Sequence, residues 1–315
     1  MKALQKPNRK GPGKPTHSQA FPDGTIIETV RDSARPETLR LLVFRRKTPI
    51  LTERFTYRGE LYVPGTINPG LAKHLRLPSG IAPCGRPSEL LAEMFATLQR
   101  YVDVPDEDLR VICAFILSSW FPDCLQSVPY LWLVGPPGSG KTTLLKLLHA
   151  LCRRAFLIGD LTPASLYQLT GLLSPTLIID ENDGANSQMS RQIERILRMG
   201  NSPGAPIIRN GRAFDTYGPK VLASRQPPLD AALGSRSIII PMLPSKRGLT
   251  ALDQVSKERI AEQFQPKLLM CRLQNHDLLH TSLEFYRETE SLTPRIRDIA
   301  HALASPLRFV NTLED

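Results

Sequence analysis

The chain has 315 residues, enough for one large domain or two ordinary ones, and its hydrophobic fraction of 41% is normal for a folded core. No apolar run approaches the roughly 20 residues of a membrane-spanning helix, so we expect no membrane partner. The formal net charge of +10 favours a polyanionic partner, although basic surfaces are often only solvated faces.

Cysteine and histidine usage gives no sign of a disulfide framework or a zinc site. The five cysteines include no Cys-x-x-Cys pair, which indicates reduced, mostly buried thiols in a cytoplasmic protein. The polar first residues do not resemble a signal peptide. His276 and His280 could share a helix face, but no Cys, Asp or Glu completes a zinc set with them.

The N-terminal quarter divides into two predicted segments. Residues 1–20 are basic, contain no acid and are rich in Pro and Gly, which predicts a disordered tail that serves either as a phosphate-binding arm or as a solubilising segment. Residues 21–80 read as a β-rich accessory module without catalytic residues. Its strand-like segments are 25–30, 38–44, 50–57 and 60–63, with Arg58-Gly59 as a hairpin turn.

The rest of the chain alternates between helical and strand patterns. Residues 81–125 form a predicted helical prelude, with helices over 88–102 and 106–120. A P-loop ATPase core is predicted for residues 126–247, and residues 248–315 have the helical periodicity of a lid.

A strand, a glycine-rich turn and a leucine-rich helix follow one another from Tyr130 to Cys152. Within this stretch Gly135, Gly140, Lys141 and Thr142 fit the spacing Gly, four residues, Gly-Lys-Ser/Thr. Glycines let backbone N–H groups approach phosphates, the lysine reaches the β- and γ-phosphates, and the threonine hydroxyl can hold Mg²⁺. The predicted nucleotide-binding residues are Gly135, Pro136, Pro137, Gly138, Ser139, Gly140, Lys141, Thr142 and Thr143.

A second motif follows 39 residues after Lys141, where the apolar segment 176–179 ends in Asp180 and Glu181. An acid at the carboxyl end of a neighbouring strand can hold the Mg²⁺ that Thr142 also contacts, so Asp180 is the second predicted metal ligand. Glu181 can orient or deprotonate the attacking water. The two motifs together predict ATP and Mg²⁺ as cofactors.

Four further elements complete the predicted core. Residues 190–199 form an amphipathic helix, and 219–224 and 237–242 are buried strands. Between them Asn210-Gly211 joins two short apolar-containing runs, which is a strong hairpin signal and brings Arg209 and Arg212 close to the tip.

From about residue 102 to 307 the chain resembles AAA+-type P-loop ATPases, and more narrowly the primase-helicase-associated ATPases of phages and plasmids. The motifs that carry this are 135–142, 177–181, 218–224 and 235–240. The resemblance implies an α/β fold with a parallel sheet ordered 5-1-4-3-2 and flanking helices. It also implies a homo-oligomeric ring with ATP at its subunit boundaries.

The same resemblance assigns roles to four further residues. Ser224 matches the sensor-1 position, where such proteins often have Asn, and Arg225 is the next candidate. Arg236 matches the arginine finger that reaches a neighbour's γ-phosphate. Arg209 and Arg212 fall where ring helicases place a basic pore hairpin, so they either contact DNA or belong to a solvated hairpin.

The sequence therefore predicts an oligomeric Mg²⁺-dependent ATPase, a DNA helicase or translocase that acts with replication proteins. Two alternatives stay open. One is an ATP-driven protein remodeller or loader, and the other is a nucleotide-dependent switch in a mobile-element or defence system. The pair Asp180-Glu181 argues against a protein that only binds nucleotide, because binding alone does not need the second acid.

Overall fold

The structure is a computed structural model in which the chain separates into two compact units, Met1–Asn68 and Pro69–Asp315. The first boundary therefore lies before residue 80, and Leu75 bridges Phe156 of the second unit. Among the helices described, none is long and apolar enough to cross a bilayer. The described residues are 13–159, 162, 164–167, 169, 174–180, 188–204, 206–209, 211–279, 289 and 291–308.

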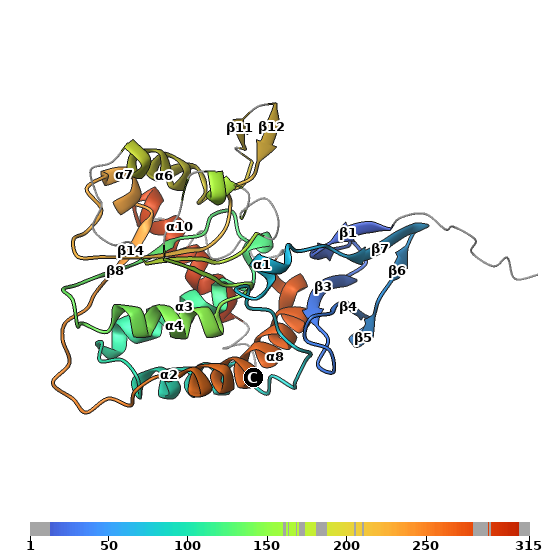
Figure 1. The fold of residues 1–315 in the computed structure, drawn as a ribbon, viewed down its shortest axis with the longest axis horizontal. Coiled ribbons are helices and arrows are strands. Elements are labelled where there is room, and N and C mark those ends of the chain that lie inside the picture. Colours follow the sequence, from blue (N-terminus) through green and yellow to red (C-terminus); the bar gives the residue numbers. More distant parts are fainter. Residues whose placement is uncertain are drawn as a thin grey trace, which may run out of the picture. The chain divides into compact units, whose positions relative to one another are not determined.

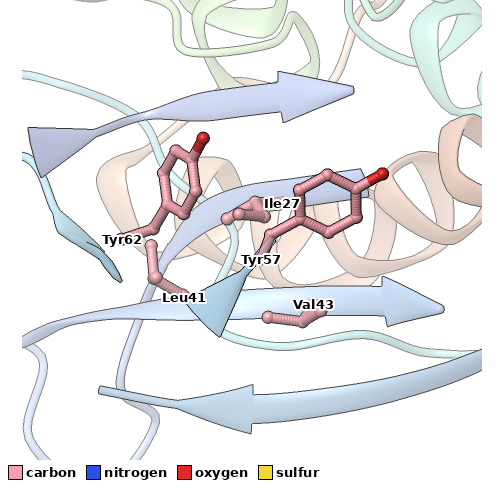
Figure 2. Close-up of a cluster of buried hydrophobic side chains, with 5 residues drawn as sticks. All are labelled: Ile27, Leu41, Val43, Tyr57 and Tyr62. Atoms are coloured by element: carbon pink, nitrogen blue, oxygen red, sulfur yellow. The ribbon is translucent and has the colours of Figure 1, made fainter. Parts of the chain in front are cut away.

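The first unit consists of two small sheets that share one core. The antiparallel sheet has the order β2-β3-β4-β5, and the other has the order β1-β7-β6. Ile27, Leu41 and Val43 of the first sheet pack with Tyr57 and Tyr62 of the second (Figure 2). The strands are β1 (Lys14–Thr16), β2 (Ser18–Ala20), β3 (Ile26–Arg31), β4 (Leu39–Arg45), β5 (Thr48–Thr52), β6 (Phe55–Tyr57) and β7 (Glu60–Pro64).

This unit confirms the hairpin at Arg58-Gly59, because Tyr57 pairs with Glu60 across it. Two other expectations were wrong. Residues 14–20 are not a disordered tail, since β1 pairs with β7 and β2 with β3, and the composition of the segment carries no trace of these partners. The single strand expected over 50–57 is split, because β5 and β6 belong to different sheets. Residues 1–12 lie outside the described residues.

The second unit is built on a five-stranded sheet with the order β14-β8-β13-β10-β9, in which every pairing is parallel. Numbered along the chain, this order is 5-1-4-3-2, as the resemblance implied. The fold is therefore an α/β P-loop NTPase fold. The strands are β8 (Tyr130–Val134), β9 (Phe156–Ile158), β10 (Leu177–Asp180), β13 (Lys220–Ser224) and β14 (Ser237–Pro241), with the hairpin β11 (Ile207–Arg209) and β12 (Arg212–Phe214) between β10 and β13.

Helices cover both faces of this sheet (Figure 1). One face packs on α6 and α7 through a cluster that includes Tyr130, Trp132, Leu197 and Leu233. Helix α4 contacts the other face at β9, β10 and β13. The helices are α1 (Pro69–Ala72), α2 (Pro87–Gln99), α3 (Asp106–Ser118), α4 (Lys141–Leu151), α6 (Gln188–Met199), α7 (Ala231–Gly234), α8 (Gln254–Leu279) and α10 (Pro294–Ala304), with 3-10 turns at Pro122–Cys124 and Ser305–Leu307.

The helices before and after the core pack together. Helix α8 lies against both α4 and α2, and α10 lies against α3. The side-chain amide of Gln265 in α8 donates to the carbonyls of Ala150 and Cys152. Carbonyls at the end of a helix have no intrahelical donors, so this contact satisfies two of them at the end of α4. Arg272 of α8, whose side chain is fully buried, binds both carboxylate oxygens of Asp123. All five cysteines are free thiols, in line with the sequence.

Candidate nucleotide site at the carboxyl edge of the sheet

The turn after β8 needs its glycines for two different reasons. Gly138 and Gly140 have φ angles of 78° and 87°, in the left-handed region that side chains disfavour. A Cβ on Gly135 would lie 2.1 Å from the carbonyl oxygen of Met242, because the chain beyond β14 passes directly over the turn. The amide of Met242 donates to Val134 O at 2.7 Å and fixes that approach.

Lys141 folds back over this loop. Its Nζ donates to the carbonyls of Gly135 and Pro136, the latter at 2.8 Å, and lies 3.4 Å from Ser139 Oγ. Helix α4 begins at the same residue, with no acidic residue in its first turn and no side-chain cap. A half-exposed ammonium therefore lies at an uncapped helix N-terminus, an arrangement that attracts phosphate.

Two oxygen ligands meet beside this lysine. Thr142 Oγ1 lies 3.4 Å from Asp180 Oδ2, although the two residues come from α4 and from the end of β10. Two adjacent ligands of an octahedral Mg²⁺, each about 2.1 Å from the metal, are roughly 3 Å apart. The pair therefore fits one Mg²⁺ with little movement. Glu181, the predicted catalytic base, lies outside the described residues.

Ser224 ends β13, directly beside the last residue of β8. Its hydroxyl is already engaged, because it accepts from Trp132 Nε1 at 2.7 Å and donates to Gln226 O at 2.5 Å. Arg225, the alternative sensor, is exposed after the strand. Ser224 thus lies at the same end of the strands as the P-loop, but its hydroxyl is bonded to Trp132 and Gln226.

Arg236 lies near the amino ends of the strands, opposite the ends that carry the P-loop. It precedes β14, and its carbonyl accepts from the amide of Tyr130, the first residue of β8. The five residues of β8 span roughly 13 Å between that point and the P-loop. The guanidinium donates through Nε to Asn201 Oδ1 at 3.1 Å and through Nη1 to Ala232 O. Burial and the nearby charge of Arg295 lower the pKa of Arg236.

The predicted hairpin is present as β11 and β12, with Arg209 paired to Arg212. It projects from the face of the second unit that carries α6 (Figure 1). The side chain of Arg212 is exposed, and so is Ile208, which keeps 72% of its surface. The arginine side chain at 209 and the turn residue Asn210 lie outside what the structure describes.

Sequence reasoning missed Lys220, the first residue of β13. It is 1% exposed and donates to three carbonyls, those of Gly200, Thr216 and Gly218. Burial lowers its pKa to about 7. A lysine that opens an otherwise apolar strand was the available signal, but nothing in its local sequence says whether it is buried.

Asp123, Cys124 and His276 form a second polar group whose ligand atoms lie within 4.8 Å of one another. His276 Nε2 is 3.0 Å from Asp123 Oδ2, the same oxygen that Arg272 binds at 2.6 Å. Burial alone would raise the pKa of Asp123, but Arg272 and His276 hold it well below its usual range. The guanidinium already supplies the positive charge here, so this group is an ion-pair network and not a metal site.

Comparison with known proteins gives distant similarities only. No family model matches the chain. The apo C-terminal region of NrS-1 is 12% identical, with 85% of this chain and 75% of that chain covered and a TM-score of 0.40. A full-length MCM homolog from Methanopyrus kandleri is 14% identical, with 93% and 70% covered and a TM-score of 0.44. The JCV helicase is 15% identical, with 66% and 72% covered and a TM-score of 0.32.

Proposed function

We propose that this chain is a Mg²⁺-dependent ATPase that works as an oligomeric motor on DNA. The observation that carries the chemistry is the approach of Thr142 Oγ1 to Asp180 Oδ2, 3.4 Å apart and next to Lys141. Three groups that a nucleoside triphosphate needs meet at one edge of a P-loop sheet: a cation for the phosphates, an uncapped helix N-terminus and two metal ligands.

In this proposal each residue has a separate task. Lys141 leaves the loop carbonyls and binds the β- and γ-phosphates, while Thr142 and Asp180 hold the metal ion. Bound Mg²⁺ neutralises phosphate charge that builds up during transfer. Glu181 orients the attacking water and accepts its proton.

The proposal that the active form is an oligomer rests on Arg236. Its distance from the P-loop of its own chain leaves a neighbouring subunit as the site it could serve. Nε and Nη1 are bound within the chain, and the described residues provide no partner for Nη2, which could reach outward. Arg236→Ala subunits should bind ATP yet inhibit wild-type neighbours when mixed. Activity strictly proportional to the wild-type fraction would contradict this role.

DNA as the substrate rests on the β11–β12 hairpin and the net charge of +10. Hydrolysis should be measured with no nucleic acid, with single-stranded DNA and with duplex DNA. The variant Arg209→Ala, Arg212→Ala should keep basal hydrolysis, because neither residue belongs to the nucleotide site, and lose stimulation by DNA. A protein lacking residues 1–12 provides the best background, since the basic arm is removed and β1 is kept.

One observation favours a second candidate, an ATP-driven protein remodeller. Ile208 is 72% exposed on the same hairpin, and an apolar side chain suits a peptide better than a phosphate backbone. Undiminished DNA stimulation in the double arginine variant, together with loss of activity in Ile208→Ser, would favour this candidate over the DNA motor.

A further inference from the structure

Positive charge is concentrated in the first unit. Residues 1–68 contain 13 lysines and arginines against 6 acids, a surplus of seven out of the +10 of the whole chain. The unit is about a fifth of the sequence and supplies none of the residues named in the proposed nucleotide site. Lys2, Lys6, Arg9 and Lys10 lie outside the described residues, so residues 13–68 contribute nine cations against the same six acids.

Three turns of this unit lie together at one end, which we call the turn end: residues 21–25, 45–48 and 57–60. Ile26 pairs with Phe44, so the turn before β3 lies beside the turn after β4. Phe21 of the first turn stacks on Tyr57, with ring centroids 3.9 Å apart, and so brings in the turn after β6.

Four of the six charged residues at the turn end are cations, and the two acids are Asp23 and Glu60, of which Glu60 lies 3.6 Å from Lys14. Arg45, Arg46, Lys47 and Arg58 are all exposed there. Asp23 lies 3.9 Å from Arg45, and its other oxygen accepts from the amide of Thr25. Within the described residues, the side chains of Arg46 and Lys47 form no hydrogen bond or ion pair.

The backbone at these positions is unusual. Arg46, Lys47 and Arg58 have φ angles of 50°, 62° and 46°, in the left-handed region. Two-residue hairpin turns of this kind favour Asn-Gly, which adopts these angles without strain. The β4–β5 turn has Arg-Lys in place of such a pair, so the chain accepts backbone strain where it presents two charges. Backbone strain of this kind tends to occur at functional sites.

The other end of the same sheet is different. Arg40 pairs with Asp32 at 3.2 Å, and Arg31 donates to Pro36 O at 2.9 Å. Asp32 also accepts from the amide of Ala34. Arg31 and Arg40 therefore take part in the local structure of that end, whereas the side chains of Arg46 and Lys47 extend into solvent.

We propose that the turn end of the first unit is a second nucleic-acid contact, which binds the sugar–phosphate backbone without reading base sequence. Three consecutive cations on a hairpin tip match the closely spaced charges of such a backbone. A lipid surface fits less well, because the two large apolar residues of the turns are not exposed: Phe21 is half-buried and Tyr57 is buried. The contact shares its partner with the proposed DNA motor but does not require nucleotide.

The test uses the full chain with Arg46→Asn, Lys47→Gly. This change removes two charges and supplies the turn pair that the backbone prefers, so the fold should be at least as stable by thermal melting. Arg35→Gln, Arg54→Gln is the matched control, because it removes two exposed arginines near the opposite end. Fluorescence anisotropy with random-sequence single strands and duplexes, without nucleotide, measures affinity from about 0.05 to 0.3 M salt.

Each lost phosphate contact should weaken duplex binding about 8-fold at 0.1 M salt, so the turn variant should lose about 60-fold and its salt slope should become shallower by about 2. The control should lose far less. Equal losses in both variants, or an unchanged slope in the turn variant, would overturn the proposal. The proposal would also be overturned if the turn variant kept its DNA binding but lost binding to polyglutamate or to anionic vesicles. ATP hydrolysis is assayed separately, so the DNA-binding result can be interpreted even if the ATPase assignment fails.

Discussion

Lys141 and Lys220 lie at opposite ends of the strands of one parallel sheet. The ammonium group of each has three oxygen partners. Lys141 contacts two loop carbonyls and the hydroxyl of Ser139. Lys220 contacts three carbonyls of the segments 200 and 216–218. The hydrogen bonds are alike, but Lys141 is half-exposed whereas Lys220 keeps 1% of its surface.

This difference separates a lysine that can exchange partners from one that cannot. In the proposed nucleotide site, phosphate oxygens replace the loop carbonyls at Lys141, which is open to solvent. No ligand reaches Lys220, so its bonds only hold the chain between α6 and β13 against the sheet. Accessibility, and not the number of hydrogen bonds, distinguishes a binding group from a structural one.

The largest expected effect is on stability at Lys220. Lys220→Ala leaves three carbonyls without this donor and a space beside the Tyr130 ring, which Nζ approaches to 5.0 Å. Urea unfolding should show a loss of about 3–5 kcal/mol. Lys220→Met refills the volume without the donor and should lose less. A change within about 1 kcal/mol for Lys220→Ala would contradict the structural role.

The pH dependence of stability sharpens the same contrast. Burial lowers the pKa of Lys220 to about 7, below the roughly 10.4 of an unfolded lysine. Between these values the unfolded chain binds more protons, so the free energy of unfolding should rise with pH, by up to about 1.4 kcal/mol per unit. The slope should be present in the wild type between pH 7 and 9.5 and reduced in Lys220→Met. Equal slopes in the two proteins would show that Lys220 does not titrate there.

A smaller effect is expected at Ser224. Ser224→Ala leaves the indole N–H of Trp132, a residue only 5% exposed, without its acceptor. We expect a loss of about 1–2 kcal/mol in stability and a fall in hydrolysis of less than about tenfold. Ser224→Thr keeps an acceptor and should restore most of the stability. A much larger fall in hydrolysis with unchanged stability would instead support the sensor role.

The smallest stability effect is expected at Lys141. Because this side chain is half-exposed and bonds only to its own loop, Lys141→Ala should change the unfolding free energy by less than about 1 kcal/mol. Unfolding of this variant and of Lys220→Ala in one urea series tests the contrast. Similar losses in the two variants would show that accessibility does not separate these lysines.

The core sheet and its two motifs could be predicted because their signals are local. Three apolar residues directly before Asp180, and Gly-Lys-Thr after a buried strand, are signals that lie within a few residues of one another. The two hairpins at Arg58-Gly59 and Asn210-Gly211 were predictable for the same reason, since turn residues fix their own backbone.

Features that depend on distant partners were not predictable. Residues 14–16 are a strand only because residues 62–64 lie beside them. The burial of Lys220 depends on the carbonyls of residues 200 and 216. Whether Ser224 has a free hydroxyl depends on Trp132, 92 residues away. The residues next to each of these positions in sequence do not indicate which distant partner it contacts.

Steady-state phosphate release tests most directly whether the site at the carboxyl ends of the strands hydrolyses ATP. Wild type, Lys141→Ala and Glu181→Gln should be compared with and without Mg²⁺, with ATP binding measured in parallel. We predict Mg²⁺-dependent release by wild type, loss of both binding and turnover in Lys141→Ala, and retained binding with at least about 100-fold slower turnover in Glu181→Gln. Equal hydrolysis by wild type and Glu181→Gln, or hydrolysis that ignores Mg²⁺, would contradict the claim.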